Sequence, residues 1–316
     1  MYREVPCPLC GSSGRRLVYH ATRPPRPVDP AELACTTALL ASYDDVTKCR
    51  SCGLFYTCPR PSDDELLAGY TVVADIAFLD ERRGRERTWR RLLDRLERLS
   101  GGADRGSGRS AGPAGRRKGR LLDAGCSMGF FMKEARDRGW EVRGLDPSRW
   151  AAEYGRREFG LDITPGTIAG VELEPASFDV VTIWDAVEHL VDPVGDITKL
   201  AAALKPGGLF ALSTHSLRSP AALLMGRNYP FLMAMHVTHF TPRTTALLLS
   251  KCGLVQFSAR PHVRFLRAGY IAGKLEARLP LAGRVVRRAL GALGLSGLQV
   301  PVVGLGIFDA FARKPG

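Results

Sequence analysis

Two cysteine pairs near the N-terminus have the spacing of a metal site. Cys7 and Cys10 stand in the segment Cys-Pro-Leu-Cys-Gly, and Cys49 and Cys52 repeat the pattern in Cys-Arg-Ser-Cys-Gly. Each segment predicts a tight turn whose sulfurs point inward while the glycine relieves the backbone. Four thiolates form the closed tetrahedral site that structural zinc favours, with no open position for chemistry. We therefore expect zinc to stabilise this part of the fold.

Two reducible disulfides are the alternative use of the same four cysteines. The N-terminal segment lacks the apolar core of a signal peptide, so we expect a cytoplasmic location. Disulfides are disfavoured in that compartment, which leaves metal binding or free thiols for the eight cysteines of the chain. Cys35 and Cys58 are spare ligand candidates, although neither belongs to a paired turn.

A glycine-rich turn follows a short apolar segment at residues 121–131, which read Leu-Leu-Asp-Ala-Gly-Cys-Ser-Met-Gly-Phe-Phe. Asp123 stands at the end of the predicted strand, and Gly125, Ser127 and Gly129 follow at every second position. Glycine lets the backbone approach a ligand because it has no Cβ. The helix that follows points its free N–H groups at the same place. This strand–turn–helix predicts a nucleoside site.

Three later segments support this interpretation. A second short strand ends in Asp146, where a carboxylate is suited to hold ribose hydroxyls, and the strand over 177–185 ends in Asp185. Residues 204–212 then read as a Lys-Pro-Gly-Gly turn followed by another strand. Strands and helices alternate to about residue 259, which indicates a parallel sheet with helices on both faces. Ligands bind beyond the carboxyl ends of such strands, so Asp123, Asp146 and Asp185 should share one rim, whereas Asp179 begins its strand and is interpreted as structural.

Taken together, these segments resemble the class I S-adenosylmethionine-dependent methyltransferases over roughly residues 119–260. The resemblance implies an α/β, Rossmann-like sheet with helices on both faces, and S-adenosyl-L-methionine as cofactor. It also implies a set of cofactor-binding residues in the turn and at the strand ends: Asp123, Gly125, Cys126, Ser127, Gly129, Phe130, Asp146, Pro147 and Asp185. Ser127 stands where many members have a second glycine, and serine is small enough for this position.

The N-terminal part adds a weaker resemblance. A zinc-ribbon start, an aromatic Gly-Leu-Phe-Tyr strand and Pro-Arg-Pro-Ser are similar to a branch of methyltransferases associated with sugars, glycans and secondary metabolites. This implies a small-molecule, sugar or glycan acceptor. After the strand that ends in Asp185 there is no Asn- or Asp-Pro-Pro-aromatic turn, which grips amino groups in many N-methylating enzymes. Its absence favours O-methylation, or C-methylation at an activated carbon.

Histidine is the usual base for a hydroxyl acceptor near neutral pH. His189 follows the strand that ends in Asp185, within a Glu-His-Leu pattern that also suits a structural role. His236 and His239 belong to a segment that overhangs the same rim. We therefore name His239, His236 and His189 as candidate catalytic bases. A metal cluster of His215, His236 and His239 is the alternative, but no carboxylate accompanies these three at ligand spacing in the sequence, so we do not favour it.

The predicted organisation has four parts: a zinc-ribbon-like module at 1–70, a connecting amphipathic helix within 71–100, a flexible Gly/Arg linker at 101–119, and the cofactor-binding domain at 120–316. Segments 213–243 and 261–303 interrupt the alternation of strands and helices, and we expect them to form the acceptor pocket together. Arginines alternate with apolar residues in 261–303. A lid or substrate wall is favoured there, with a dimer face or a contact with an anionic membrane as alternatives.

The formal net charge of +13 favours anionic partners, although an arginine-rich composition alone also accounts for it. An RNA methyltransferase is therefore the alternative function, because the zinc module and the arginine-rich linker fit it. No RNA-specific motif is visible, which favours the small acceptor. A non-catalytic binding module is disfavoured because Asp123, Gly125, Gly129 and Asp146 are all present. No uncharged apolar run approaches about 18 residues, so no membrane-spanning helix is expected; the oligomeric state stays open.

Overall fold

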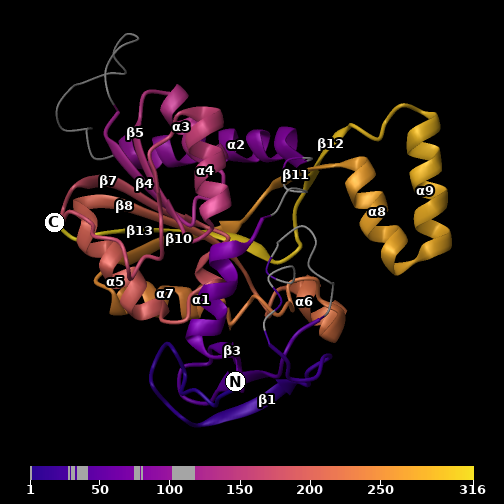
Figure 1. Ribbon diagram of the computed structural model, residues 1–316, viewed down its shortest axis with the longest axis horizontal. Helices are drawn as coiled ribbons and strands as arrows, with labels where there is room; N and C mark the ends of the chain where they lie inside the picture. Colours follow the sequence, from indigo (N-terminus) through magenta and orange to yellow (C-terminus); the bar gives the residue numbers. More distant parts are fainter. Residues whose placement is uncertain are drawn as a thin grey trace.

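The computed structural model describes residues 2–27, 29, 33, 42–74, 79, 81–101 and 118–316. These ranges contain a seven-stranded sheet, a four-stranded sheet close to the N-terminus, and a two-stranded ribbon (Figure 1). Cys35 and most of the predicted linker, residues 102–117, lie outside the described residues.

The large sheet has the strand order β10-β13-β8-β7-β4-β5-β6. Its strands are β4 (Arg120–Ala124), β5 (Glu141–Asp146), β6 (Ile163–Pro165), β7 (Phe178–Trp184), β8 (Leu204–His215), β10 (Val255–Pro261) and β13 (Ile307–Arg313). Neighbours from β6 to β8 pair in parallel, whereas β13 is antiparallel to both β8 and β10. The predicted Rossmann-like sheet is therefore confirmed, as a mixed sheet whose strand order reverses at β4 and β7.

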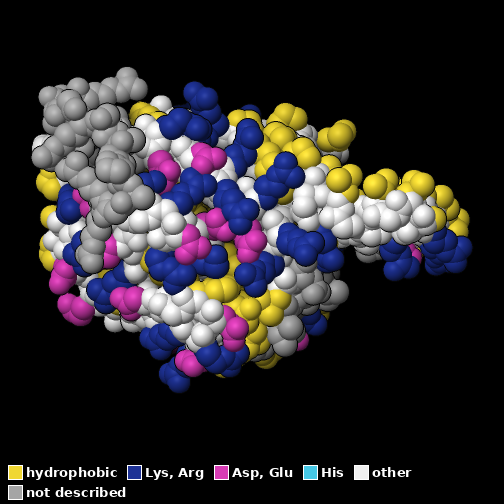
Figure 2. Space-filling model, turned by 90° about the horizontal axis from the view of Figure 1, so that it is seen from above, with side chains coloured by type: hydrophobic (Ala, Val, Ile, Leu, Met, Phe, Trp, Pro, Cys, Tyr) yellow, Lys and Arg dark blue, Asp and Glu magenta, His cyan; other side chains and the backbone are white. Residues whose placement is uncertain are grey.

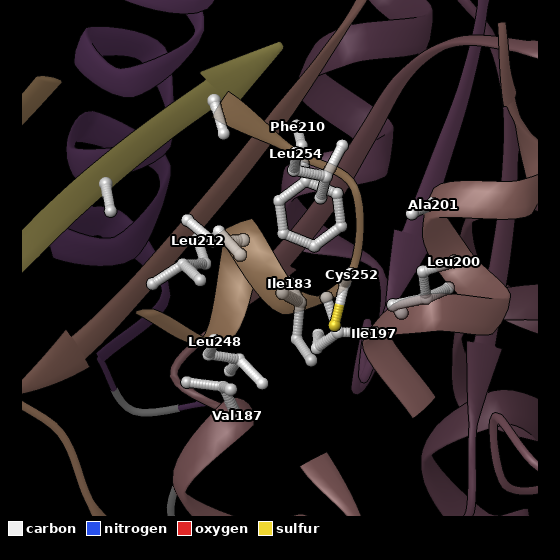
Figure 3. Close-up of a cluster of buried hydrophobic side chains, with 14 of the residues drawn as sticks. Ile183, Val187, Ile197, Leu200, Ala201, Phe210, Leu212, Leu248, Cys252 and Leu254 are labelled. Atoms are coloured by element: carbon white, nitrogen blue, oxygen red, sulfur yellow. The ribbon is translucent and has the colours of Figure 1, made fainter. Parts of the chain in front are cut away.

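Helices cover both faces of this sheet because its strands are apolar on both sides. On one face, α5 (Pro193–Ala203) and α7 (Pro242–Lys251) pack on β7 and β8. Figure 3 shows this cluster, with Ile183 and Phe210 from the sheet facing Ile197 of α5 and Leu248 of α7. On the other face lie α2 (Arg82–Ser100), α3 (Phe130–Asp137) and α4 (Arg149–Phe159).

Helix α2 corresponds to the amphipathic helix that periodicity predicts over 78–99, although it begins at Arg82. Its buried apolar side chains are Trp89, Leu92, Leu93 and Leu96. The helix passes so close to β11 (Arg264–Arg267) that a Cβ at Gly84 would lie 2.2 Å from the carbonyl oxygen of Phe265. The connecting helix is thus fixed against the sheet at one end and against a distant part of the chain at the other.

The four-stranded sheet joins the N-terminal segment to a much later one. Strands β1 (Arg15–Tyr19), β2 (Val46–Cys49) and β3 (Phe55–Thr57) pair in sequence order, and β3 then pairs with β9 (Thr238–His239). Helix α1 (Asp63–Val72) follows, and Ser62 and Glu65 form a capping box at its start. The boundaries of the four predicted parts stay a prediction.

The remaining elements belong to the two interrupting segments. Segment 213–243 contains α6 (Pro220–Met225), the short 3-10 helix at Gly226–Asn228 and β9. Segment 261–303 contains β11, paired with β12 (Gln299–Val302), and the helices α8 (Ala268–Arg278) and α9 (Pro280–Ala292). These two helices form a hairpin that projects from the body of the molecule (Figure 1). None of the helices in the described ranges is long and apolar enough to cross a membrane.

Candidate active site

A cavity of about 720 Å³ opens where β4, β5 and β7 end, at the reversal of strand order. Its volume is that of a site for a small organic ligand. Eight of the nine residues that the sequence assigns to the cofactor line it: Asp123, Gly125, Cys126, Ser127, Phe130, Asp146, Pro147 and Asp185. The ninth, Gly129, is the N-cap of α3 with φ +76°, and a Cβ there would lie 2.5 Å from Leu161. Gly129 therefore shapes the turn from behind.

The turn after β4 is built from residues with left-handed backbone conformations. Gly125 has φ +70° and Ser127 has φ +50°. The N–H groups of Gly125 and Cys126 both donate to the carbonyl oxygen of Leu145, at 2.8 and 3.1 Å, which ties the turn to β5. A Cβ at position 125 would lie 2.8 Å from that of Ala186. The turn thus forms a narrow cradle that a larger residue would fill, which fits a bound nucleoside.

Two buried carboxyl groups face the cavity beside this turn. Asp146 accepts hydrogen bonds from the backbone N–H groups of Ser127 and Ser148, at 2.7 and 2.9 Å. Burial raises the pKa of Asp146 to about 6, against the lowering effect of these two bonds. Burial raises the pKa of Asp123 to about 7; the hydroxyl of Thr182, which donates at 2.7 Å, opposes the shift, and the charge of Asp146 adds to it.

Asp185 is held in the charged state by a residue that the sequence analysis did not identify. Arg264, on β11, forms an ion pair with Asp185, and the hydroxyl of Ser213 donates to the same carboxylate at 2.8 Å. Burial alone would raise the pKa of Asp185, but Arg264 and His262 together lower it below its ordinary value. Segment 261–303 therefore reaches across to the rim of the sheet.

Two histidine rings of the cavity wall have Nδ1 close to backbone carbonyl oxygens. His189 Nδ1 lies 3.0 Å from the carbonyl oxygen of Met235 and 2.8 Å from the hydroxyl of Tyr70, and His236 Nδ1 lies 2.8 Å from the carbonyl oxygen of Phe231. A carbonyl oxygen only accepts, so His236 donates from Nδ1, and its neutral ring leaves Nε2 with a lone pair. At His189 the carbonyl oxygen favours the same proton position, while the Tyr70 hydroxyl at Nδ1 can donate or accept. Both residues line the cavity. Burial, with His215 and His189 adding to it, keeps the pKa of His236 well below its ordinary value.

His239 lies behind this pair. It is fully buried and is absent from the cavity wall, and its Nδ1 lies 2.8 Å from Nε2 of His215, which does line the wall. The structure thus brings His189 and His236 to the cavity and places His239 one ring further back. Burial lowers the pKa of His215 to about 3, so this ring is neutral.

Glu188 supplies the carboxylate that the sequence spacing does not show. Its Oε1 lies 3.6 Å from His215 Nδ1, although the residues are far apart in the chain. Glu188 Oε2, His215 Nδ1 and His239 Nε2 are buried without a hydrogen-bond partner in the described part of the chain. Two overlapping sets, His215/His236/His239 and Glu188/His189/His236, each have ligand-type atoms within 4.8 Å of one another. In the folded chain a carboxylate, Glu188, does accompany these histidines, so the expectation from the sequence that none does is wrong.

Further lining residues come from elements that only the fold brings together. They are Tyr70 on α1, Glu81, Arg85 and Trp89 at or on α2, Phe131 on α3, Trp184 on β7, and Phe265, Tyr270 and Lys274 from segment 261–303. Trp89 belongs to the buried side of α2. Trp89, Phe131 and Trp184 contact one another, with ring centroids 5.4 to 6.2 Å apart. Both interrupting segments contribute to the wall.

The four paired cysteines come together at the N-terminus. Cys7 Sγ lies 3.5 Å from Cys52 Sγ, and Cys10 Sγ lies 3.6 Å from Cys49 Sγ. A zinc–sulfur bond of 2.3 Å in a tetrahedral site predicts sulfur–sulfur distances of about 3.7 Å. The glycine after each pair has a positive φ and donates its N–H to the carbonyl oxygen of the first cysteine, at 2.8 and 3.2 Å. The four sulfurs therefore fit a zinc ion.

The fold and this site define a class I S-adenosylmethionine-dependent methyltransferase. The sequence pattern of the family described as "Methyltransferase domain" matches residues 82–257, more than half of the chain, and the chain belongs to that family. The chain thus carries a domain of the methyltransferase family.

Curated relatives named "Ubiquinone biosynthesis O-methyltransferase" are similar to part of the chain. The protein from Methylocella silvestris is 30% identical over 150 residues, which are 44% of this chain and 59% of that protein. The one from Idiomarina loihiensis is 35% identical over 132 residues, 40% of this chain and 52% of that protein. The chain thus spans little more than half the length of these relatives. A solved S-adenosylmethionine-dependent methyltransferase from Thermotoga maritima is 16% identical, with a TM-score of 0.43, and covers 72% of this chain and 98% of that one.

Proposed function

We propose that the enzyme transfers a methyl group to a hydroxyl oxygen of a small-molecule, sugar or glycan acceptor that binds in the 720 Å³ cavity. The observation that carries the proposal is the pair of imidazole rings, His189 and His236, that line the cavity with Nδ1 of each close to a backbone carbonyl oxygen. A hydroxyl acceptor has a proton to lose, and a neutral imidazole accepts it. The names of the curated relatives, which are O-methyltransferases, point to the same acceptor atom.

S-adenosylmethionine, when bound, supplies a methyl group on a sulfonium. The turn from Asp123 to Gly129 is proposed to hold its nucleoside by close contact with the backbone, which the absence of a Cβ at Gly125 permits, and Asp146 to accept from the ribose hydroxyls. The remaining task of the chain is alignment of acceptor and donor. We assign this to segments 213–243 and 261–303, which supply the wall opposite the turn, including Phe231 and Tyr270. His239 does not line the cavity, and its Nδ1 lies 2.8 Å from His215, which does.

The base is tested by replacing His236 and His189 one at a time with alanine. Turnover should fall by about a hundredfold in the variant that removes the base, while cofactor affinity stays close to wild type. Radiolabelled S-adenosylmethionine and a small-molecule extract of the source organism provide the assay, with calorimetry for cofactor binding. His239→Ala is the comparison variant, because His239 contacts His215 and does not line the cavity. Wild-type turnover in both the His236 and His189 variants would refute the base assignment.

The pH profile gives a second readout. Burial holds the pKa of His236 well below its ordinary value, so the ring is neutral and competent as a base throughout the neutral range. If His236 is the base, turnover should stay level as the pH falls through about 6.5, the ordinary histidine value, and decline only at lower pH. A decline centred on that ordinary value would point away from His236.

The cofactor site is tested with Asp146→Ala. The ribose hydroxyls would lose a charged acceptor, and hydrogen bonds to charged groups contribute about 1.5–3 kcal/mol, so affinity should fall by roughly tenfold to a hundredfold. Asp179→Ala is a matched control, because Asp179 lies at the opposite rim and binds Arg120 and Lys205. Unchanged affinity in Asp146→Ala, measured by calorimetry, would contradict the assignment.

The RNA alternative predicts a different product. Label from the cofactor would then appear in the RNA fraction, and co-purified RNA would be released by salt. The largely apolar wall of the cavity favours the small acceptor. Label confined to RNA would replace the proposed function by the alternative.

We also propose that Cys7, Cys10, Cys49 and Cys52 hold one structural zinc ion. Elemental analysis of reduced protein should find about one zinc per chain, and Cys49→Ser should lose it. A second metal per chain that survives in Cys49→Ser would instead assign an ion to the histidine–glutamate cluster. Protein without metal would remove the zinc proposal.

A further inference from the structure

The exposed apolar surface of the molecule is concentrated in one short segment. Of the fifteen large hydrophobic side chains that are exposed in the described part of the chain, eight lie within residues 279–303. They are Leu279, Leu281, Val285, Val286, Leu293, Leu295, Leu298 and Val303. Single exposed apolar residues are normal on a soluble protein, but a cluster on a projecting element marks an interaction surface.

Helix α9 separates its apolar and basic side chains. At 100° per residue, Val285, Val286 and Leu293 fall within one arc of about 100°, whereas Arg284, Arg287 and Arg288 fall within another such arc on the opposite side. Leu281 lies at the edge of the apolar arc, about 20° from Arg288. Figure 2 shows hydrophobic side chains along one side of the projecting hairpin and basic ones on the opposite side of its far end.

Helix α8 leaves the apolar side of α9 uncovered. The two helices meet at Gly283, where a Cβ would lie 2.1 Å from the backbone of Glu276. Gly283 is the buried residue of α9, whereas Leu281 is 80% exposed and Val285 is 67% exposed. The hairpin is therefore closed along one narrow strip, and the leucine and valine side of α9 faces solvent.

The charge of the segment complements an anionic surface. Residues 261–303 contain seven arginines and lysines and a single acidic residue, Glu276. Arg264 and Arg267 pair with Asp185 and Glu81, which lie outside the segment. Glu276 pairs with Arg287 at 2.8 Å and with Arg284 at 3.7 Å, so the three arginines of α9 share a single carboxylate from the segment. Basic side chains beside an exposed apolar arc are the pattern of a helix that lies in the headgroup region of an anionic bilayer.

We propose that α9 and the turn after it, residues 279–298, form a docking surface for an anionic lipid membrane. Val285 and Leu281 would enter the acyl boundary, and the arginines would contact lipid phosphates. A second copy of the chain is the less suitable occupant. A two-fold interface brings the same patch together from both sides, and here it would place two sets of arginines next to one another.

Docking would also place the cavity at the membrane. Helix α8, which carries α9, contributes Tyr270, Ile271, Lys274 and Leu275 to the cavity wall. An acceptor with a lipid tail would therefore meet the wall where the hairpin meets the bilayer. This last step rests on the proposed function, whereas the docking surface does not.

The test is co-sedimentation of the full chain with vesicles of phosphatidylcholine containing about 30% phosphatidylglycerol, an anionic lipid. Val285→Glu is compared with Val255→Glu, the same substitution at a similarly exposed valine, 60%, on β10. We expect wild type and Val255→Glu to bind, Val285→Glu to bind at least tenfold more weakly, and binding to weaken with salt. Pure phosphatidylcholine vesicles should bind less. Equal binding of the two variants, or no binding of wild type, would overturn the proposal.

Two controls separate the remaining outcomes. Calorimetry with S-adenosylmethionine on the same samples shows whether the fold and the cofactor site survive. If vesicle binding is lost while cofactor binding is intact, the proposed function is unaffected. Leu293→Glu, beyond the end of α9, is the second variant if Val285→Glu does not fold. Sedimentation velocity identifies a second copy as the occupant if a dimer forms in wild type and is lost in Val285→Glu without any vesicle binding.

Discussion

The side chains at the cavity show how burial sets protonation. His215, His236 and His239 are buried among one another, and their pKa values are lowered, so the rings are neutral and keep lone pairs. Burial raises the pKa of Asp123 instead. The neutral form is favoured in both cases, and for a carboxyl group the neutral form is the protonated one. Ionisation of Asp123 in the cofactor-free protein therefore costs stability.

Asp123→Asn measures that cost. The folded chain keeps the Asp123 proton up to about pH 7, whereas the unfolded chain releases it near pH 3.8. The cofactor-free protein therefore loses stability as pH rises through this window, and the full penalty is present above it. Asparagine keeps the acceptor for Thr182 without the charge, so the variant should be more stable than wild type at pH 8 by a few kcal/mol, on the order of the pKa shift.

Thermal denaturation without cofactor at pH 8 and pH 5 checks this expectation. The gain should shrink at pH 5, because wild-type Asp123 is then protonated for most of the time in the folded state. Thr182→Val is the matched control, since it removes the hydroxyl donor and should destabilise the protein at both pH values. A gain of equal size at both pH values would show that charge on Asp123 is not the cause.

At the scale of elements, α2 holds segment 261–303 over the cavity. Gly84 allows the helix to touch the backbone of Phe265, and Thr88 Oγ1 accepts from the Phe265 N–H at 3.0 Å. Arg264, one residue earlier, reaches Asp185 from this strand. The position of Arg264 therefore depends on a contact between two backbones, which only glycine permits.

Gly84→Ala should push α2 and β11 apart. The new Cβ would lie 2.2 Å from a carbonyl oxygen, and overpacking of this kind costs about 1–3 kcal/mol. Gly273→Ala, in α8, is the matched control, because nothing lies within 4 Å of its Cβ. In that open position alanine should be neutral or stabilise the helix by about 0.5–1 kcal/mol. Chemical denaturation of both variants checks the difference, and equal stabilities would show that the close crossing is not a constraint.

Elements with a strong local pattern could be predicted from the sequence. The apolar strands that end in Asp123, Asp146 and Asp185 give the parallel part of the sheet, and the spacing of Trp89 and its neighbours gives α2. The site beyond the turn could not be predicted in the same way. Glu188 meets His215, and Arg264 meets Asp185, through contacts between residues that are distant in sequence, and no local period records such contacts.

At the scale of the whole molecule, the N-terminal segment supports the histidines of the site. Strand β3 pairs with β9, so that Phe55 lies opposite His239. The N–H of Thr57 donates to the carbonyl oxygen of Val237 at 2.9 Å, and its hydroxyl donates to that of His236 at 3.1 Å. Strand β9 has only two residues, so its position next to β3 depends on these few hydrogen bonds.

Strand β3 is in turn attached to the proposed zinc site. Cys49 ends β2, which pairs with β3, and Cys52 stands shortly before β3 begins. Metal removal should therefore loosen the chain from the cysteines through β3 to His236 and His239. The cofactor turn is tied to β5 instead, so S-adenosylmethionine should still bind, whereas turnover should fall.

Amide hydrogen exchange after treatment with 1,10-phenanthroline tests this coupling. Exchange of residues 236–239 should become at least about tenfold faster, which corresponds to a loss of about 1.4 kcal/mol of local protection, while Glu141–Asp146 in β5 stays protected. Cys49→Ser should behave like the metal-free protein. Cys58→Ser is the matched control, because Cys58 is buried in the same module but lies outside the cluster, and a serine hydroxyl can still accept from the N–H of Val5. Unchanged exchange at 236–239 in metal-free protein would mean that β3 keeps its position without the ion, and that the cysteine site stabilises the N-terminal turns alone.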